Sequence, residues 1–232
     1  MTRARKAEQR RGSGISFRIF LDWLAVRSSD KKTVGGMLII YDADKGDKSA
    51  DKVAAALHLI QVMDPVRYRR VVRDLKQIWI TTIPGAAGQF VRSTSTCELD
   101  ERFVTGEHIS IEEVAGAIVH EATHARLDQC GIGYEERLRT RVEEVCMRRE
   151  LAFAAKLPEG AGIRRWVEAR QNGPVDYSNA AFNTREIAGI RDAMIHLGMP
   201  IWFADTIVFI GRLRRRGSAK RQEGKSASEP PN

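Results

Sequence analysis

The spacing of apolar positions changes along the chain, and this change predicts a mixed fold. Residues 50–63 repeat apolar side chains at helical spacing. Asp64 is an N-cap residue followed by proline, so a second helix is expected to begin at Pro65 and to reach about Lys76. Residues 77–83 are instead rich in β-branched and aromatic side chains, which is typical of a strand. Further short strands are expected over residues 36–41, 89–94 and 96–99.

From Ser110 onward the pattern is helical, with breaks at glycine and proline pairs. Residues 15–27 are apolar, and their spacing fits a strand and a helix equally well. The fold class expected is therefore α+β, with a small mixed or antiparallel sheet early in the chain and a mainly helical C-terminal half. The helical breaks fall near residues 131–133, 158–162, 173–174 and 198–200.

Basic residues gather at the two ends of the 232-residue chain. The formal net charge is +8 at pH 7. Residues 1–14 contribute +4 and residues 212–232 contribute +5, which leaves about −1 for residues 15–211. We therefore expect one domain over residues 15–213, between a disordered basic arm (1–14) and a disordered basic tail (214–232).

The two basic ends of the chain are candidate sites of contact with an anionic partner. We interpret them as solubility aids, and contact with nucleic acid or an anionic membrane surface is the alternative. A nucleic-acid-binding fold would need a basic face on structured elements, and the sequence between the tails shows none.

Cysteine usage and hydropathy favour a cytoplasmic protein. The odd number of cysteines and the lack of a CxxC pair argue against a disulfide framework and against a zinc site built from cysteines. No apolar segment directly follows the basic N-terminus, so a secretory signal is not expected. Residues 194–211 contain Pro200 and Asp205, which favours buried helices over a membrane span. The cysteines are Cys97, Cys130 and Cys146.

One predicted helix carries side chains that can bind a metal ion and accept a proton. Ser110 and Glu113 form a capping-box pattern that marks its start. His120 and His124 lie one turn apart, opposite the aliphatic stripe, so both imidazoles can reach one metal ion at about 2.0–2.1 Å. Glu121 then points beside the metal, where it can accept a proton from a metal-bound water.

The run from His120 to His124 reads HEATH, which is the HExxH motif and resembles the zincin metallopeptidases. The resemblance covers about residues 77–157. It implies a Zn²⁺ cofactor held by His120 and His124, with Glu121 as the general base in hydrolysis of a peptide or protein substrate. It also implies an edge strand within residues 89–99, to which an extended substrate would add by antiparallel pairing.

A catalytic zinc needs a third protein ligand, and no histidine follows in the next turns. The next helix, expected over residues 134–157, carries three glutamates. Glu143 flanks the apolar stripe of that helix and follows His124 by 19 residues. The gluzincin branch of the zincins has its glutamate ligand at similar spacing, so the resemblance favours Glu143. Glu144 and Glu150 remain alternatives.

Other parts of the site stay open. Tyr134, Tyr177 and His196 are candidate donors to the oxyanion, and the sequence does not choose among them. Two other functions also remain. One is a zincin scaffold that binds a protein partner without catalysis, and the other is a peptidase held at nucleic acid or a membrane by its basic tails.

Overall fold

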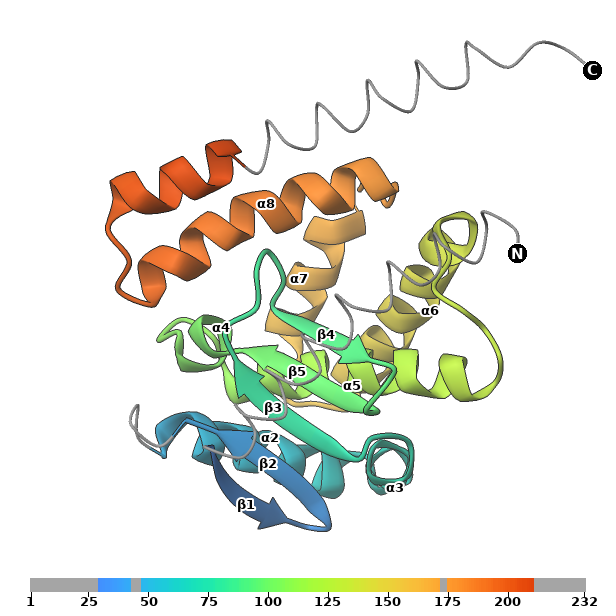
Figure 1. Cartoon of the computed structure of the whole chain (residues 1–232). Coiled ribbons are helices and arrows are strands. Elements are labelled where there is room, and N and C mark those ends of the chain that lie inside the picture. The colour runs from blue at the N-terminus through green and yellow to red at the C-terminus, as the bar shows by residue number, and fades with distance from the viewer. Residues whose placement is uncertain (1–28, 43–46, 172–174, 211–232) are drawn as a thin grey trace, which may run out of the picture.

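A computed structural model describes residues 29–42, 47–171 and 175–210. It contains a five-stranded mixed sheet with helices packed against it (Figure 1), which confirms the α+β class. The strands lie in the order β1-β2-β3-β5-β4. Their bounds are β1 (Asp30–Val34), β2 (Met37–Tyr41), β3 (Gln77–Thr81), β4 (Gly88–Val91) and β5 (Thr96–Asp100).

The centre of the sheet is parallel and its two edges are antiparallel. Strands β2, β3 and β5 run parallel, while β1 pairs antiparallel with β2 and β4 pairs antiparallel with β5. Gly35 and Gly36 join β1 to β2 with φ angles of 56° and 87°, the left-handed conformation that a tight hairpin requires. Every residue of β5 is buried, whereas β4 is half-buried and forms an edge.

Helix α5 lies at the centre of the molecule, where it packs against α2, α3, α6, α7, β4 and β5. Its buried residues on the core side include Val114, Ile118 and Ala125, which come from the predicted aliphatic stripe. Ile111, at the start of that stripe, is exposed. The helices are α2 (Lys48–Met63), α3 (Pro65–Asp74), α4 (Glu101–Thr105), α5 (Ile111–Gln129), α6 (Glu136–Ala154), α7 (Ala161–Gln171) and α8 (Asn179–His196), and residues 201–210 form a last helix.

Two elements, β1 and α4, have no counterpart among the predicted ones. β1 is a polar, largely exposed edge strand, so it lacks the apolar alternation that marks a strand in a sequence. α4 has five residues, too few for a helical period, and Asp100 caps it by accepting from the backbone amides of Arg102 and Phe103. The strand expected over residues 89–94 ends at Val91, because a turn with Ser95 at φ 52° follows.

Burial of the C-terminal helices was predicted wrongly. Leu197, Trp202 and Phe209 are 65%, 70% and 61% exposed, since helix 201–210 buries chiefly Ala204 and Val208. Within the described ranges, no helix is both long and apolar enough to cross a membrane. The expected arm (1–14), the apolar residues 15–27 and the expected tail (214–232) lie outside the described residues.

Helix α8 crosses closely over the loop between β3 and β4. A Cβ atom added at Gly189 would lie 1.9 Å from the backbone nitrogen of Gly85. Gly85 itself adopts a φ of +75°, and a Cβ atom there would lie 2.5 Å from the carbonyl oxygen of Arg185. Two glycines therefore allow this approach, although α8 buries little else than Gly189 and Ala193.

We predict that Gly189→Val weakens the docking of α8. The added side chain meets backbone atoms that cannot rotate away, so the free energy of local opening should fall by about 1–3 kcal/mol. Ala188→Val is the matched control, because Ala188 is exposed on the same helix. Amide hydrogen exchange over residues 179–196 measures the effect. Equal protection of α8 in both variants would contradict the close contact.

Candidate metal centre

Helix α5 presents His120, Glu121 and His124 on the side that α6 covers. Ser110 accepts from the backbone nitrogen of Glu113, whose carboxylate accepts from the backbone nitrogen of Ser110, so the predicted capping box is confirmed. His120 and Glu121 are buried and His124 is half-buried. The chemical face of α5 is thus largely enclosed, although less completely than the aliphatic one.

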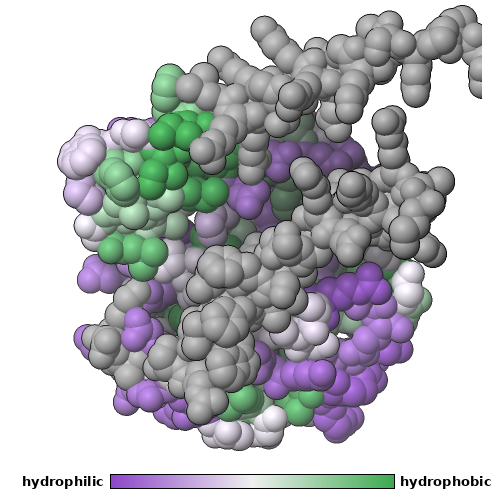
Figure 2. Space-filling view, viewed as in Figure 1, coloured by the Kyte–Doolittle hydropathy of each residue, from purple (hydrophilic) through white to green (hydrophobic). Residues whose placement is uncertain are grey.

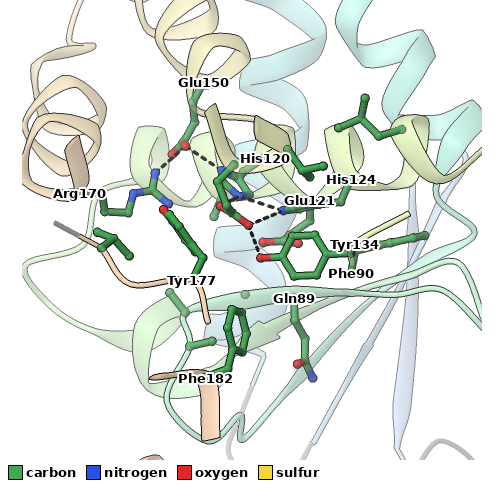
Figure 3. Close-up of a pocket in the computed structure, with 18 of the residues that line it drawn as sticks. Gln89, Phe90, His120, Glu121, His124, Tyr134, Glu150, Arg170, Tyr177 and Phe182 are labelled. Carbon is green, nitrogen blue, oxygen red and sulfur yellow. Dashed lines mark hydrogen bonds and ion pairs between the residues drawn. The ribbon is translucent and has the colours of Figure 1, made fainter. Parts of the chain in front are cut away.

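Two imidazoles and one carboxylate converge between α5 and α6 (Figure 3). The Nε2 atoms of His120 and His124 lie 3.2 Å apart. Glu143 spans both rings, with one oxygen 3.3 Å from Nε2 of His120 and the other 3.4 Å from Nε2 of His124. This triangle joins residues that are up to 23 positions apart in the chain.

The donor set and its spacing fit a zinc ion. Two neutral Nε2 atoms and a carboxylate all present electron pairs, so a cation or a proton must lie between them. Ligand atoms held at about 2.0–2.1 Å around a tetrahedral zinc are about 3.3 Å from one another. The separation of the two Nε2 atoms, and that of each Nε2 atom from one of the two Glu143 oxygens, lie close to this value. The side chains would therefore need little movement to hold the ion.

Glu150 fixes the orientation of His120 from behind. One of its oxygens lies 2.9 Å from Nδ1 of His120 and 2.6 Å from a guanidinium nitrogen of Arg170, at the end of α7. A neutral His120 that donates from Nδ1 to this carboxylate keeps the lone pair of Nε2 free. A carboxylate behind the histidine is the usual support of a metal ligand.

The centre carries an excess of negative charge. Glu121, Glu143 and Glu150 are buried, and Arg170 neutralises one of these three carboxylates, which leaves −2 when both imidazoles are neutral. Burial alone would lower the pKa of His120, but hydrogen bonds with Glu143 and Glu150 raise it to about 10. A proton on His120 thus offsets part of the charge of −2 at the centre. A divalent cation in the same place would neutralise that charge in full.

Glu121 faces the cavity and keeps its carboxylate free. Burial raises its pKa and the two histidines lower it in part, while no hydrogen bond to the carboxylate contributes. A Cβ atom added at Gly88 would lie 3.3 Å from Oε1 of Glu121. The carboxylate therefore lies directly beside the first residue of edge strand β4.

The structure separates the three candidate glutamates of α6. Glu143 touches both imidazoles, Glu150 touches Nδ1 of His120, and Glu144 is exposed on the opposite face. Cys146 also approaches the centre, since its Sγ lies within 4.8 Å of ligand atoms of His120 and His124. Burial and the neighbouring carboxylates raise the pKa of the Cys146 thiol, so without a metal this side chain is neutral.

The cysteine pattern argued against cysteine ligands, and no sequence pattern singled out Arg170. Positions 143, 146 and 150 are three and four residues apart, so they lie on one face of α6. That spacing could have shown Cys146 and Glu150 beside Glu143. No local pattern marked Arg170, because it lies near the end of the next helix, α7.

Of the three candidate oxyanion donors, two lie at the cavity. Tyr134 donates a hydrogen bond to Glu143, and its ring meets that of His124 edge-on at 5.2 Å between centroids. Tyr177 lines the same cavity. His196 lies elsewhere, at the end of α8, where its Nε2 is 3.6 Å from a carboxylate oxygen of Glu101.

A cavity of about 760 Å³ opens in front of the centre. Edge strand β4 forms one wall through Gly88, Gln89 and Phe90, and the start of α8 forms another through Phe182 and Arg185. Arg139 of α6 fastens that second wall by donating to the carbonyl oxygen of Tyr177 and to the side chain of Asn179. The cavity is large enough to enclose several side chains of a ligand.

Comparison with known proteins assigns no family, since no family model, curated protein or solved structure matches the chain. The chemistry of the centre therefore stands on its geometry.

We predict that Glu143→Ala removes zinc binding. The purified protein should hold about one zinc per chain, and the variant, which keeps two ligands of three, should hold almost none. Metal content by mass spectrometry is the measurement. Glu144→Ala is the control on the exposed face and should keep its zinc. If Cys146→Ser loses the metal and Glu143→Ala keeps it, the third ligand is Cys146.

Glu150→Gln should weaken zinc binding without abolishing it. The amide can still accept a hydrogen bond from Nδ1 of His120 but no longer carries charge, so affinity should fall about 10-fold to 100-fold. Competition with a chelator of known affinity measures the change. Glu144→Gln makes the same substitution on the exposed face and should leave affinity unchanged. An unaltered affinity in Glu150→Gln would show that this carboxylate does not support the metal.

Proposed function

We propose that this protein is a zinc-dependent metallopeptidase. The observation that carries the proposal is the convergence of His120, His124 and Glu143 within 3.4 Å of one another. The HExxH motif, with its resemblance to the zincins, supports the proposal from the sequence. The adjacent cavity supports it from the structure, because it gives a substrate access to the centre.

The bound zinc would polarise the carbonyl group of the substrate and lower the pKa of a water molecule to about 7. Glu121 accepts the proton of the attacking water and transfers it to the departing amine. Its position suits both transfers, because it is next to His120 in the chain and open to the cavity. Glu150 and Arg170 keep His120 in the orientation and tautomer that this chemistry needs.

Edge strand β4 supports a peptide as the substrate. It pairs with β5 on one side, and its other side belongs to the cavity wall. An extended peptide can add to such an edge by main-chain hydrogen bonds. Glu121 lies against Gly88 at the start of β4, so a peptide on this strand passes the general base.

Tyr134 is the better placed of the two candidate oxyanion donors. Its hydroxyl group already reaches Glu143, so a small rotation brings it to an oxygen held beside the ligands. Tyr177 remains the alternative donor from the opposite wall of the cavity.

A scaffold that binds a partner without catalysis does not explain why Glu121 is buried beside the ligands. A scaffold needs no buried carboxylate beside the ligands, and an unpaired one lowers stability. Glu121 is 7% exposed and burial raises the pKa of its carboxyl group, so its presence beside the ligands favours a catalytic function.

We predict that Glu121→Gln separates catalysis from metal binding. The variant keeps all three ligands and the volume of the side chain, so zinc content should be unchanged. Hydrolysis should fall at least about 100-fold, because the amide cannot accept the proton. Peptide cleavage is followed by mass spectrometry on an unfolded protein substrate. His120→Ala and His124→Ala, in contrast, should lose the metal and the activity together. Full activity in Glu121→Gln would rule out this mechanism.

A further inference from the structure

The last helix, residues 201–210, turns most of its apolar side chains outward. Ala204 and Val208 are its buried residues, and Trp202 and Phe209 lie on the other side at 70% and 61% exposure. Figure 2 shows hydrophobic residues gathered at the upper left of the molecule, where Figure 1 places this helix. The outward surface also includes Leu197, Ile201, Phe203 and Ile210.

This surface, which we term the 197–210 surface, has no free charge. Asp205 is the one charged residue in the sequence from 197 to 210, and it pairs with Arg191 of α8 at 2.6 Å. The hydroxyl group of Thr206 donates to the carbonyl oxygen of Trp202. A cluster of large exposed apolar side chains marks an interaction site.

The sequence that follows the surface is strongly basic. Residues 212–216 hold four arginines, and residues 212–232 carry a net charge of +5. Apolar aromatic side chains followed directly by a basic segment are the two components that bind a peripheral protein to an anionic bilayer.

We propose that the 197–210 surface binds a lipid bilayer, and that the bilayer is anionic because the sequence after this surface is basic. Helix 201–210 would lie in the plane of the interface, with Trp202 and Phe209 among the lipids.

Other partners satisfy only part of the observations. A second copy would bring two segments of +5 together, and their repulsion opposes such a dimer. Nucleic acid would neutralise the arginines but would leave Trp202 and Phe209 in water. A bilayer with anionic headgroups accounts for the apolar and the basic part at once.

Flotation of the full chain with vesicles tests the proposal. Binding should be strong to vesicles of phosphatidylcholine with phosphatidylglycerol and weak to phosphatidylcholine alone, and it should fall as salt is added. Trp202→Ser with Phe209→Ser should weaken binding at least about 10-fold, because two large apolar side chains no longer insert. Val62→Ser with Val66→Ser is the matched control, since both valines are exposed on other helices.

A second variant tests the electrostatic part without altering the described fold. Replacing Arg214, Arg215 and Arg216 by serine should lower affinity for anionic vesicles about five-fold per residue and flatten the dependence on salt. Zinc content and peptide cleavage should be unchanged in these variants, which separates this proposal from the proposed function.

Five results would overturn the proposal. The first is no binding to anionic vesicles, and the second is binding that is equal in the Trp202/Phe209 variant and the wild type. The third is a dimer in analytical ultracentrifugation that this variant abolishes, which would assign the surface to a second copy. The fourth is binding to duplex DNA in preference to vesicles. Vesicle binding that appears only after deletion of residues 1–28 would likewise overturn it, because the chain's own N-terminal segment would then cover the surface.

Discussion

The centre of this protein depends on burying groups that repel one another unless a cation joins them. Three carboxylates and two imidazoles meet between α5 and α6, and one guanidinium accompanies them. Removing charge from water is unfavourable unless each charge finds a partner. Without a metal, a proton on His120 supplies part of that charge, which is why its pKa rises to about 10. This excess of negative charge favours a divalent ion at the centre and accounts for the pairing of Arg170 with Glu150.

The surrounding fold serves this centre by packing rigid elements around α5. The sheet and α2 fill one side of the helix with aliphatic residues, and α6 brings Glu143 to the other. Edge strand β4 and the start of α8 form the walls of the cavity in front. Helix α8 also links the cavity to the far end of the molecule, where Arg191 holds the last helix and its outward apolar surface. A bilayer bound at that surface would lie about one helix length from the site, since the 18 residues of α8 span about 27 Å.

Much of the fold followed from local patterns. The switch from helical spacing to a β-branched segment at residue 77 predicted β3, and the Asp64–Pro65 pair predicted the start of α3. The capping box predicted α5, including the register that brings His120 and His124 to one face. β1 and α4 were missed, because a polar edge strand and a five-residue helix have no period to detect. The C-terminal helices were placed correctly but were expected to be buried, since hydropathy reports what a residue prefers and not what covers it.

The sequence by itself determined the chemistry of α5: two imidazoles one turn apart with a carboxylate between them, because helical geometry fixes the relative positions of neighbours on one helix. Only the tertiary structure decided which glutamate of α6 meets them. The rotation of α6 about its own axis depends on contacts with α5 and α7, and it turns Glu143 inward, Glu144 outward and Glu150 towards Nδ1 of His120. Arg170 reaches Glu150 from a third helix, 20 residues further along the chain. This contact between Arg170 and Glu150 leaves no pattern in the sequence. It arises from the packing of separate helices and not from the spacing of residues within one helix.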